Sequence, residues 1–234
     1  MEIQGKKAIV FGGTSGIGQA TVKMLVDGGA QVVVVSRSAG DAINLPQGAT
    51  GKSCDVRDRD AMQTLFKDCA PFDILISAAT GGDRAMGPFL QMDMDGFQGS
   101  FDKLWGYANV IRFGTEHMSE NGSIVIVSGA PARKAKAGQV ALSAVGGSVE
   151  ALVRAVAPEI APRRLNVVSP GMIDTPMFTQ TGDERKAFYQ AATGNNVIPR
   201  AGTPQEVAQA IMFMVTNDFV TGTTIDVDGG WLVS

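Results

Sequence analysis

A glycine-rich loop stands near the start of the chain, between a strand pattern and a helix pattern. The apolar run KAIVFG (7–12) leads directly into GGTSGIG (12–18), and a helical pattern follows at 16–27. Glycines at this spacing let the chain turn sharply and let backbone N–H groups approach a pyrophosphate, where the helix dipole favours anions. The alternative is a glycine-rich turn without a ligand. The strand before the loop and the helix after it favour dinucleotide binding.

The end of the second strand pattern carries the residues that distinguish NADP from NAD. The run QVVVVS (31–36) is followed by Arg37 and Ser38, and no Asp or Glu appears before Asp41. An acid at this place would bond the ribose hydroxyls of NAD and repel the additional phosphate of NADP. Arg37 can pair with a phosphate through two hydrogen bonds, and the serines beside it can donate as well. NADP is therefore favoured over NAD, with a solvated arginine at a strand end as the alternative.

Regular alternation of strands and helices would position these residues. Strand patterns lie at 7–12, 31–36, 73–77, 123–128, 164–169 and 223–227, with a weaker one at 50–56, and helical patterns lie at 16–27, 58–69, 95–119, 139–161 and 204–216. Runs that are apolar on both faces are typical of buried parallel strands, and alternation with helices indicates βαβ crossovers. We therefore predict an α/β fold, one doubly wound Rossmann-type domain over residues 1–234. The gap between the second strand and the weak one is rich in Gly, Ala and Pro, and predicts a short turn or a degenerate helix.

The composition argues against several classes of partner. With 234 residues and 44% hydrophobic content, the chain can bury a substantial core. Its net charge of −3 argues against nucleic-acid binding and against attraction to a membrane surface. No apolar run has the length of a membrane span, and the N-terminus carries a strand pattern rather than a signal peptide. Cys54, Cys69 and the single His117 predict a reduced cytoplasmic protein without a disulfide framework or a metal site.

Four motifs, in order along essentially the whole chain, resemble the classical short-chain dehydrogenase/reductase family. FGGTSGIG (11–18) matches the glycine-rich loop TGxxxGxG of that family, and CDV (54–56) matches its Asp-Val pair after the third strand. SPGMIDTP (169–176) matches its Pro-Gly motif, and VTGTTIDVDGGW (220–231) matches its terminal strand. The resemblance implies a doubly wound sheet of seven parallel strands, with helices on both faces, and a nicotinamide dinucleotide.

The resemblance also implies which residues hold that dinucleotide. Asp55 would hold the adenine, and the Thr175 hydroxyl, with the backbone of the Pro-Gly motif, would hold the nicotinamide amide. The cofactor-binding residues predicted in this way, together with Arg37, are Gly12, Thr14, Ser15, Gly16, Ile17, Gly18, Asp55, Val56, Ala78, Gly171, Ile173 and Thr175.

The catalytic residues of that family are missing at the matching positions. The family uses an Asn, a Ser and a Tyr-xxx-Lys pair, whose members share one helix face because they are four residues apart. The Ser position falls here on Gly129, the Tyr position on Leu142, the Lys position on Gly146 and the Asn position on Lys103. Residues 137–162 contain neither Tyr nor Lys, so a shifted alignment does not restore the pair. We infer that the reaction does not use the usual acid.

Two residues are candidates to act in place of the missing set. Lys103 is expected to face the nicotinamide end of the cleft, where partial burial brings a lysine pKa towards neutrality; a surface helix lysine is the alternative. Ser128 precedes the missing Ser and either points into the cleft or bonds to backbone at the strand end. Tyr107, four residues after Lys103, forms either a reversed Lys/Tyr pair or a helix–helix contact.

Three further features bear on the substrate. Arg133, Lys134 and Lys136 either attract an anionic substrate or form a solvated run of charge. Segment 177–197 follows the Pro-Gly motif, and the resemblance implies that it folds over a small-molecule substrate. SAATG (77–81) departs from the Asn-Asn-Ala-Gly of the family in its first residue.

Three functions fit these observations. The first is an NADP(H)-dependent oxidoreductase for a small carbonyl or alcohol substrate, with the proton supplied by Lys103, by water or by the substrate. The second is a non-catalytic NADP(H)-binding sensor or partner subunit, and the third is a structural homo-oligomer with a vestigial dinucleotide site. Persistence of PGMIDT (170–175) favours the first. The resemblance implies that the helices near 95–119 and 139–161 pair across a two-fold axis, which predicts a homodimer or homotetramer.

Overall fold

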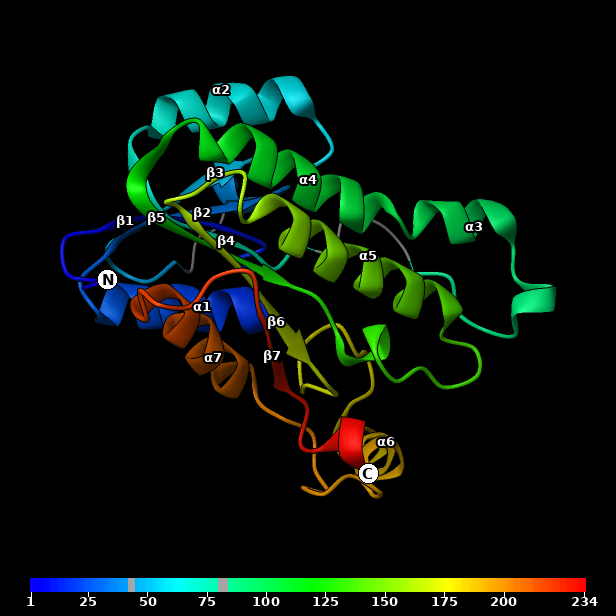
Figure 1. Cartoon of the computed structure of the whole chain (residues 1–234). Coiled ribbons are helices and arrows are strands. Elements are labelled where there is room, and N and C mark those ends of the chain that lie inside the picture. Colours follow the sequence, from blue (N-terminus) through cyan, green and yellow to red (C-terminus); the bar gives the residue numbers. More distant parts are fainter. Residues whose placement is uncertain (42–44, 80–83) are drawn as a thin grey trace.

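Seven parallel strands form one sheet in the computed structural model, which describes residues 1–41, 45–79 and 84–234 (Figure 1). The strands are β1 (Lys7–Phe11), β2 (Gln31–Ser36), β3 (Ala49–Ser53), β4 (Phe72–Ser77), β5 (Met118–Val127), β6 (Arg164–Pro170) and β7 (Thr224–Val227). Their order is β3-β2-β1-β4-β5-β6-β7, and every neighbouring pair runs parallel. The chain therefore reverses its direction of winding between β1 and β4, which confirms the predicted doubly wound fold. Such a reversal opens a crevice where ligands bind.

Helices cover both faces of the sheet. They are α1 (Gly16–Asp27), α2 (Arg59–Cys69), α3 (Met94–Gly99), α4 (Asp102–Thr115), α5 (Val140–Val156), α6 (Gly182–Thr193) and α7 (Pro204–Thr216). Short 3-10 turns lie at η1 (Ala39–Asp41), η2 (Phe89–Gln91), η3 (Ala130–Ala132) and η4 (Trp231–Val233). Figure 1 shows α1 and α7 on one face, and α2, α4 and α5 on the other.

Alternate residues of the central strands enter two separate cores. In β1, Ile9 and Phe11 pack with residues of α2, α4 and α5, whereas Ala8 and Val10 pack with residues of α1 and α7. All four side chains are fully buried. Because both faces of the strand are covered, each of its central positions must be apolar, which explains the near-continuous apolar runs in the sequence.

The helix predicted over 95–119 is divided in two. Ser100 lies at the break, where its hydroxyl donates to the carbonyl of Gly96 (2.9 Å) and accepts from the amide of Ala85 (2.9 Å). These bonds tie the break to the preceding loop, and α4 begins two residues later. The second half ends at Thr115, and β5 begins at Met118 rather than at 123. Its pairing with β4 shifts register after Met118, and the pairing resumes at Ser123.

Two other boundaries differ from the prediction. Helix α5 ends at Val156 rather than at 161, because Pro158 has no amide hydrogen and Glu159 bonds the carbonyl of Val156 in a tighter turn (2.9 Å). Helix α6 lies within segment 177–197, for which no helix was predicted. Turn η1 confirms the short connection expected after β2, although residues 42–44 of that connection lie outside the described residues.

Helix α7 has the predicted bounds of 204–216. Its first turn is closed by a capping box, in which the Thr203 hydroxyl accepts from the amide of Glu206 while the Glu206 carboxylate accepts from the amide of Thr203. Hydrogen bonds from Arg200 hold the pKa of Glu206 down at about 2.

Cys54 and Cys69 are free, buried thiols, and burial raises the pKa of both, that of Cys54 to about 11. Within residues 1–41, 45–79 and 84–234, no helix combines the length and the apolar character needed to cross a bilayer. In the same residues, no group of three or more His, Cys, Asp or Glu side chains is arranged to hold a metal ion.

Candidate active site

A cavity of about 710 Å³ opens at the carboxyl ends of the central strands, around the reversal between β1 and β4. Every residue in the predicted cofactor set lines it, from the glycine loop through Arg37, Asp55 and Ala78 to the Pro-Gly motif. Lys103 and Ser128 line it as well. The fold therefore brings together residues separated by more than 160 positions in the sequence. In the SAATG segment, Ser77 and Ala78 are described, whereas residues 80 and 81 lie outside the described residues.

The glycine loop packs so closely that side chains cannot replace its hydrogens. Gly12 has a φ of +74°, and a Cβ there would lie 2.8 Å from the amide nitrogen of Ala79. A Cβ on Gly18 would lie 2.1 Å from the carbonyl oxygen of Gly12. Ser15, the N-cap of α1, makes no side-chain capping bond. The first turn of α1 thus presents backbone amides and a hydroxyl to the cavity, an arrangement that suits an anion.

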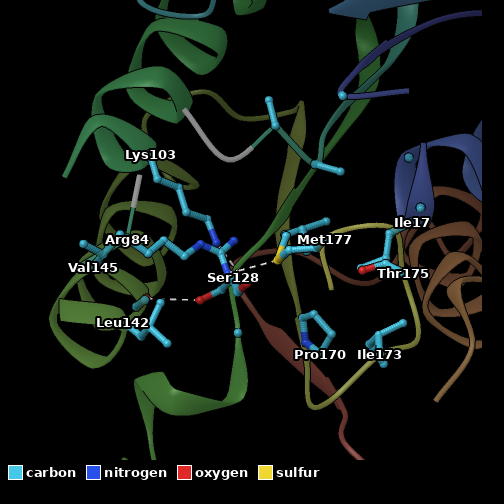
Figure 2. Close-up of a pocket in the computed structure, with 18 of the residues that line it drawn as sticks. Ile17, Arg84, Lys103, Ser128, Leu142, Val145, Pro170, Ile173, Thr175 and Met177 are labelled. Carbon is cyan, nitrogen blue, oxygen red and sulfur yellow. Dashed lines mark hydrogen bonds between the residues drawn. The ribbon is translucent and has the colours of Figure 1, made fainter. Parts of the chain in front are cut away.

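The Pro-Gly segment lies beside this loop. Thr175 is nearly buried, and a Cβ on Gly16 would lie 3.4 Å from the Thr175 side chain. Figure 2 shows Thr175 next to Ile17 on one side of the cavity. Arg185 of α6 fixes the segment, since its guanidinium donates to the Thr175 carbonyl (2.9 Å) and pairs with Asp174.

Arg37 and Asp55 define the opposite end of the cavity. The Asp55 carboxylate accepts from the side chain (2.9 Å) and the backbone amide (2.9 Å) of Arg57. The side-chain bond is the main cause that lowers the pKa of Asp55, and the charge of Arg37 contributes further. Arg37 is exposed at the end of β2 and has no ion-pair partner among the described residues. Its guanidinium is available to a phosphate at this end.

Lys103 enters the cavity from the first turn of α4. Its ammonium donates to the carbonyl oxygen of Ser128 at 3.1 Å. Loss of water around the ammonium, with a smaller contribution from the positive charge of Arg84, lowers the pKa of Lys103 to about 7. The residue keeps part of its surface open, which leaves a face towards the cavity. This geometry fits the predicted position facing the cleft rather than a lysine on the outer surface of the helix.

Tyr107 supports Lys103 from one turn further along α4. The phenol is buried and donates to the carbonyl of Val127 at 2.8 Å, and the Lys103 ammonium lies 5.6 Å from the centre of its ring. Burial raises the pKa of Tyr107. The two residues are in contact as a reversed Lys/Tyr pair, but the hydroxyl is bonded to β5 and its proton is held there.

Ser128 presents its carbonyl, not its hydroxyl, to Lys103. The buried hydroxyl donates to the carbonyl of Gly146 in α5 at 3.2 Å. Of the two alternatives for Ser128, a hydroxyl that points into the cleft or one bonded to backbone at the strand end, this bond corresponds to the second. Residues at the ends of β4 and β6 behave differently, since the buried hydroxyls of Ser77 and Ser169 have no hydrogen-bond partner among the described residues.

The wall formed by α5 is apolar. Leu142, Val145 and Gly146 line the cavity, and the sequence comparison with the family motif predicts that Leu142 and Gly146 stand at its Tyr and Lys positions. Helix α5 lies close to η3 here, because a Cβ on Gly146 would lie only 3.0 Å from the Cβ of Ala132. Gly129 has extended backbone and more room, with Pro131 as its nearest neighbour at 3.6 Å.

Charged residues near this wall fall into two groups. Arg133 forms ion pairs with Asp226 (2.6 Å) and Glu150 (3.4 Å), and the Lys134 ammonium donates to the Trp231 carbonyl (2.8 Å). Arg133 and Lys134 therefore belong to the contacts that hold the loop after η3 against β7 and the C-terminal turn η4. Lys136, by contrast, lines the cavity.

Arg84 also lines the cavity, although it was not predicted from the sequence. It follows a segment without strand or helix periodicity, so no pattern in the sequence places it. Its guanidinium approaches the Met177 sulfur at 3.5 Å. Met177 belongs to segment 177–197, from which Phe178, Ala192 and Asn196 also line the cavity.

A parallel sheet with a glycine loop at its reversal point, and a cavity that runs from that loop to a lysine, define a dinucleotide-binding α/β protein. A family model described as enoyl-(acyl carrier protein) reductase matches residues 12–232. Carbonyl reductase family member 4 of Danio rerio is 33% identical, over 95% of this chain and 96% of that protein. A 3-oxoacyl-(acyl carrier protein) reductase of Thermotoga maritima is 30% identical over the full length of both chains.

Solved structures also match this chain over nearly its whole length. A small-chain dehydrogenase in complex with NADPH has a TM-score of 0.83 at 28% identity, covering 99% of this chain and 100% of that chain. A short chain dehydrogenase/reductase family protein has a TM-score of 0.85 at 30% identity, with full coverage of both. The chain belongs to the short-chain dehydrogenase/reductase family of oxidoreductases.

Proposed function

We propose that this protein is an NADP(H)-dependent oxidoreductase for a small carbonyl or alcohol substrate, and that Lys103 carries the proton in place of the usual tyrosine. The observation that carries the proposal is the Lys103 ammonium, which lies in the cavity and is held by the Ser128 carbonyl at 3.1 Å. The structural relative that was solved with NADPH, and the reductases among the sequence relatives, support the choice of reaction.

The residues around the cavity fit NADP(H). A Cβ on Gly12 or Gly18 would lie within 2.8 Å of backbone atoms, so glycine is what allows the tight turn that brings the loop amides to the first turn of α1, where a pyrophosphate would bind. Arg37 would pair with the 2′-phosphate, Asp55 would accept from the adenine, and Thr175 would bond the nicotinamide amide. NADP(H), when bound, supplies or accepts the hydride.

Lys103 has the protonation behaviour that this chemistry needs. With its pKa lowered to about 7, both forms are populated near neutral pH. The ammonium form would donate its proton to the substrate oxygen during reduction, and the amine form would accept it during oxidation. The Ser128 carbonyl orients the Lys103 nitrogen, which also lies 5.6 Å from the centre of the Tyr107 ring. No equivalent proton is available from Leu142, Val145 or Gly146.

Replacing Lys103 tests this proposal. Lys103→Met keeps the length and apolar stem of the side chain and removes the proton. We expect oxidation of NADPH by a panel of ketones to fall by about 10²-fold or more. NADPH affinity, measured by calorimetry, should stay within about twofold because Lys103 is not among the residues assigned to the cofactor. Unchanged turnover in Lys103→Met would show that the proton comes from elsewhere.

A non-catalytic NADP(H)-binding sensor or partner subunit is the second candidate, and the apolar wall at Leu142 and Gly146 supports it. The same assay separates the two functions. If the protein is a sensor, the parent and Lys103→Met should bind NADPH with the same affinity, and neither should oxidise NADPH with any ketone. Lys23→Met on the exposed face of α1 serves as the matched control, since it removes a lysine far from the cavity.

A further inference from the structure

Positive charge is concentrated at the end of the cavity that holds Lys103. Figure 2 shows Arg84 and Lys103 side by side in the cavity, and Lys136 and Arg37 line the same cavity. The acidic residue among the described lining residues is Asp55, which lies at the Arg37 end and is already bound by Arg57. The Lys103 end therefore carries cations without a lining carboxylate.

These three cations differ from the arginines around them in their partners. Arg133 and Arg185 each bind a carboxylate. In the part of the chain that the structure describes, no ion pair forms at Arg84, Lys103 or Lys136. Arg84 contacts the sulfur of Met177, a weak acceptor, and Lys136 lies 5.8 Å from the centre of the Trp231 ring.

Two of the cations point towards the same place. Figure 2 shows the side chains of Arg84 and Lys103 converging beside Ser128, with Leu142 and Met177 on either side. The Arg84 residue as a whole is exposed, yet loss of water around its guanidinium lowers its pKa. Like charges held close together with little water repel each other, and an anion between them removes the repulsion and replaces the lost hydration.

We propose that the substrate is an anionic carbonyl compound, whose carboxylate or phosphate is held by Arg84 with help from Lys136 while its carbonyl faces Lys103. This inference rests on the proposed oxidoreductase function for the carbonyl, but the anion site itself is defined by the cations. A guanidinium matches the paired oxygens of either anion through two parallel hydrogen bonds, whereas an ammonium acts as a point charge.

The remaining lining sets the character of the rest of the substrate. Leu142 and Met177 lie beside Arg84 and Lys103 in Figure 2, and Phe178 and Trp231 line the same cavity. An apolar or aromatic body with one anionic end fits both sets of residues. Such a substrate would lie against both Arg84 and Met177, which already contact each other.

Binding of unreactive probes tests the anion site directly. Phenylacetate, phenyl phosphate and phenylacetamide share an aromatic body, carry no ketone or aldehyde carbonyl to accept a hydride, and differ in their charged end. We expect calorimetry, with and without saturating NADPH, to show at least one of the anions binding about tenfold or more tightly than the amide. Tighter binding of phenylacetate assigns a carboxylate, and tighter binding of phenyl phosphate assigns a phosphate.

Variants at Arg84 identify the residue responsible. Arg84→Gln should reduce the affinity for the anions to that for the amide. Arg84→Lys should keep part of the preference for the anions, because lysine keeps the positive charge but cannot form the two parallel hydrogen bonds of a guanidinium. Lys23→Gln, with the same change of charge on α1, should leave the preference unchanged. Circular dichroism and NADPH affinity confirm that each variant is folded.

Failure of this inference is distinguishable from failure of the proposed function. Equal binding of acid and amide, no binding of either anion, or an unchanged preference in Arg84→Gln would each overturn the anion site. Ketone-dependent NADPH oxidation would then still support the oxidoreductase. Conversely, an anion preference without any turnover would overturn the redox role and leave the anion site standing.

Discussion

The ammonium nitrogen of Lys103 lies 3.1 Å from the carbonyl oxygen of Ser128, so the first turn of α4 meets the carboxyl end of β5 inside the cavity. One turn further along α4, Tyr107 bonds the preceding carbonyl, that of Val127. The two contacts fix both the position of the lysine and the direction of its side chain. The proton carrier that we propose therefore comes from α4, while the facing wall of α5 is apolar.

The pH dependence of turnover should follow Lys103. Reduction needs the ammonium form, so we expect kcat/KM for carbonyl reduction to fall as pH rises through about 7, and the oxidation rate to rise over the same interval. Arg84 and Tyr107 are the charged and titratable groups that face the lysine. Of these, Arg84 stays protonated, and burial raises the pKa of Tyr107. Stopped-flow assays across the pH range check this, and the same profile in Lys103→Met would contradict it.

Stability should also depend on pH through this residue. The folded state holds the pKa of Lys103 at about 7, against an ordinary value of 10.5, so between these values the unfolded chain binds more protons than the folded one. The free energy of unfolding therefore rises with pH across that window, and the cost of the buried charge is fully present below it. Lys103→Met has no such cost. Urea unfolding should therefore give Lys103→Met a higher free energy of unfolding than the parent protein. This difference should shrink as pH increases from about 6 to about 9. A difference that is independent of pH would rule this out.

Cofactor preference should depend on Arg37. We expect the parent protein to bind NADPH more tightly than NADH, and Arg37→Asp to reverse the order, because aspartate repels the 2′-phosphate and bonds ribose hydroxyls. Loss of a charged hydrogen-bonding pair corresponds to a change of about tenfold or more in the affinity for NADPH. Fluorescence titration measures both affinities. Lys67→Asp, an exposed position on α2, is the control for the change in charge. Equal affinities for the two dinucleotides in the parent would contradict the assignment.

Oligomeric state is a further prediction from the resemblance, in which α4 and α5 pair with their copies across a two-fold axis. Trp105 projects from α4 with 58% of its surface exposed, which is unusual for a tryptophan and suits an interface. We expect light scattering to show a dimer or tetramer at micromolar concentration and Trp105→Glu to shift it towards monomer. A monomeric parent protein would be the contrary result.

The glycine loop was predictable from the sequence because the strand before it and the helix after it fix it in space. The close approach of Gly18 to the carbonyl oxygen of Gly12 lies within the loop itself, whereas the contact of Gly12 with Ala79 at the end of β4 follows only from the fold. The break at Ser100 was not predictable, since it depends on Ala85, fifteen residues earlier in the chain. Arg133 could be assigned to an ion pair only once β7 was placed beside η3, because its partner Asp226 lies 93 residues away.

Lys103 could be predicted as a cavity residue from the sequence, whereas Arg84 could not, for a similar reason. Lys103 occupies a motif with helical spacing, which places its side chain relative to the start of α4. Arg84 follows β4 in a loop without periodicity, and its direction is set by contacts such as that with Met177, 93 residues later. Residues on regular elements can be placed from a pattern, whereas residues on loops depend on tertiary contacts.

Restoring the catalytic set of the family tests whether the apolar wall limits the rate. Gly129→Ser fits the space observed, since the nearest neighbour of an added Cβ lies 3.6 Å away. Gly146→Lys does not fit as well, because its Cβ would lie 3.0 Å from that of Ala132. Overpacking of this kind costs about 1–3 kcal/mol, so Ala132→Gly should accompany the substitution.

With Leu142→Tyr added, the combined variant carries a Ser, a Tyr and a Lys at the matching positions. We expect ketone reduction to rise by about 10²-fold or more over the parent protein, the range of a positioned acid. The matched control has Leu142→Phe in the same background, which supplies the bulk of tyrosine without its hydroxyl. A rate that rises equally in both variants would assign the gain to packing rather than to proton transfer. If NADPH still binds, the unfolding free energy is retained and neither variant gains, then the missing tyrosine is not what limits the reaction.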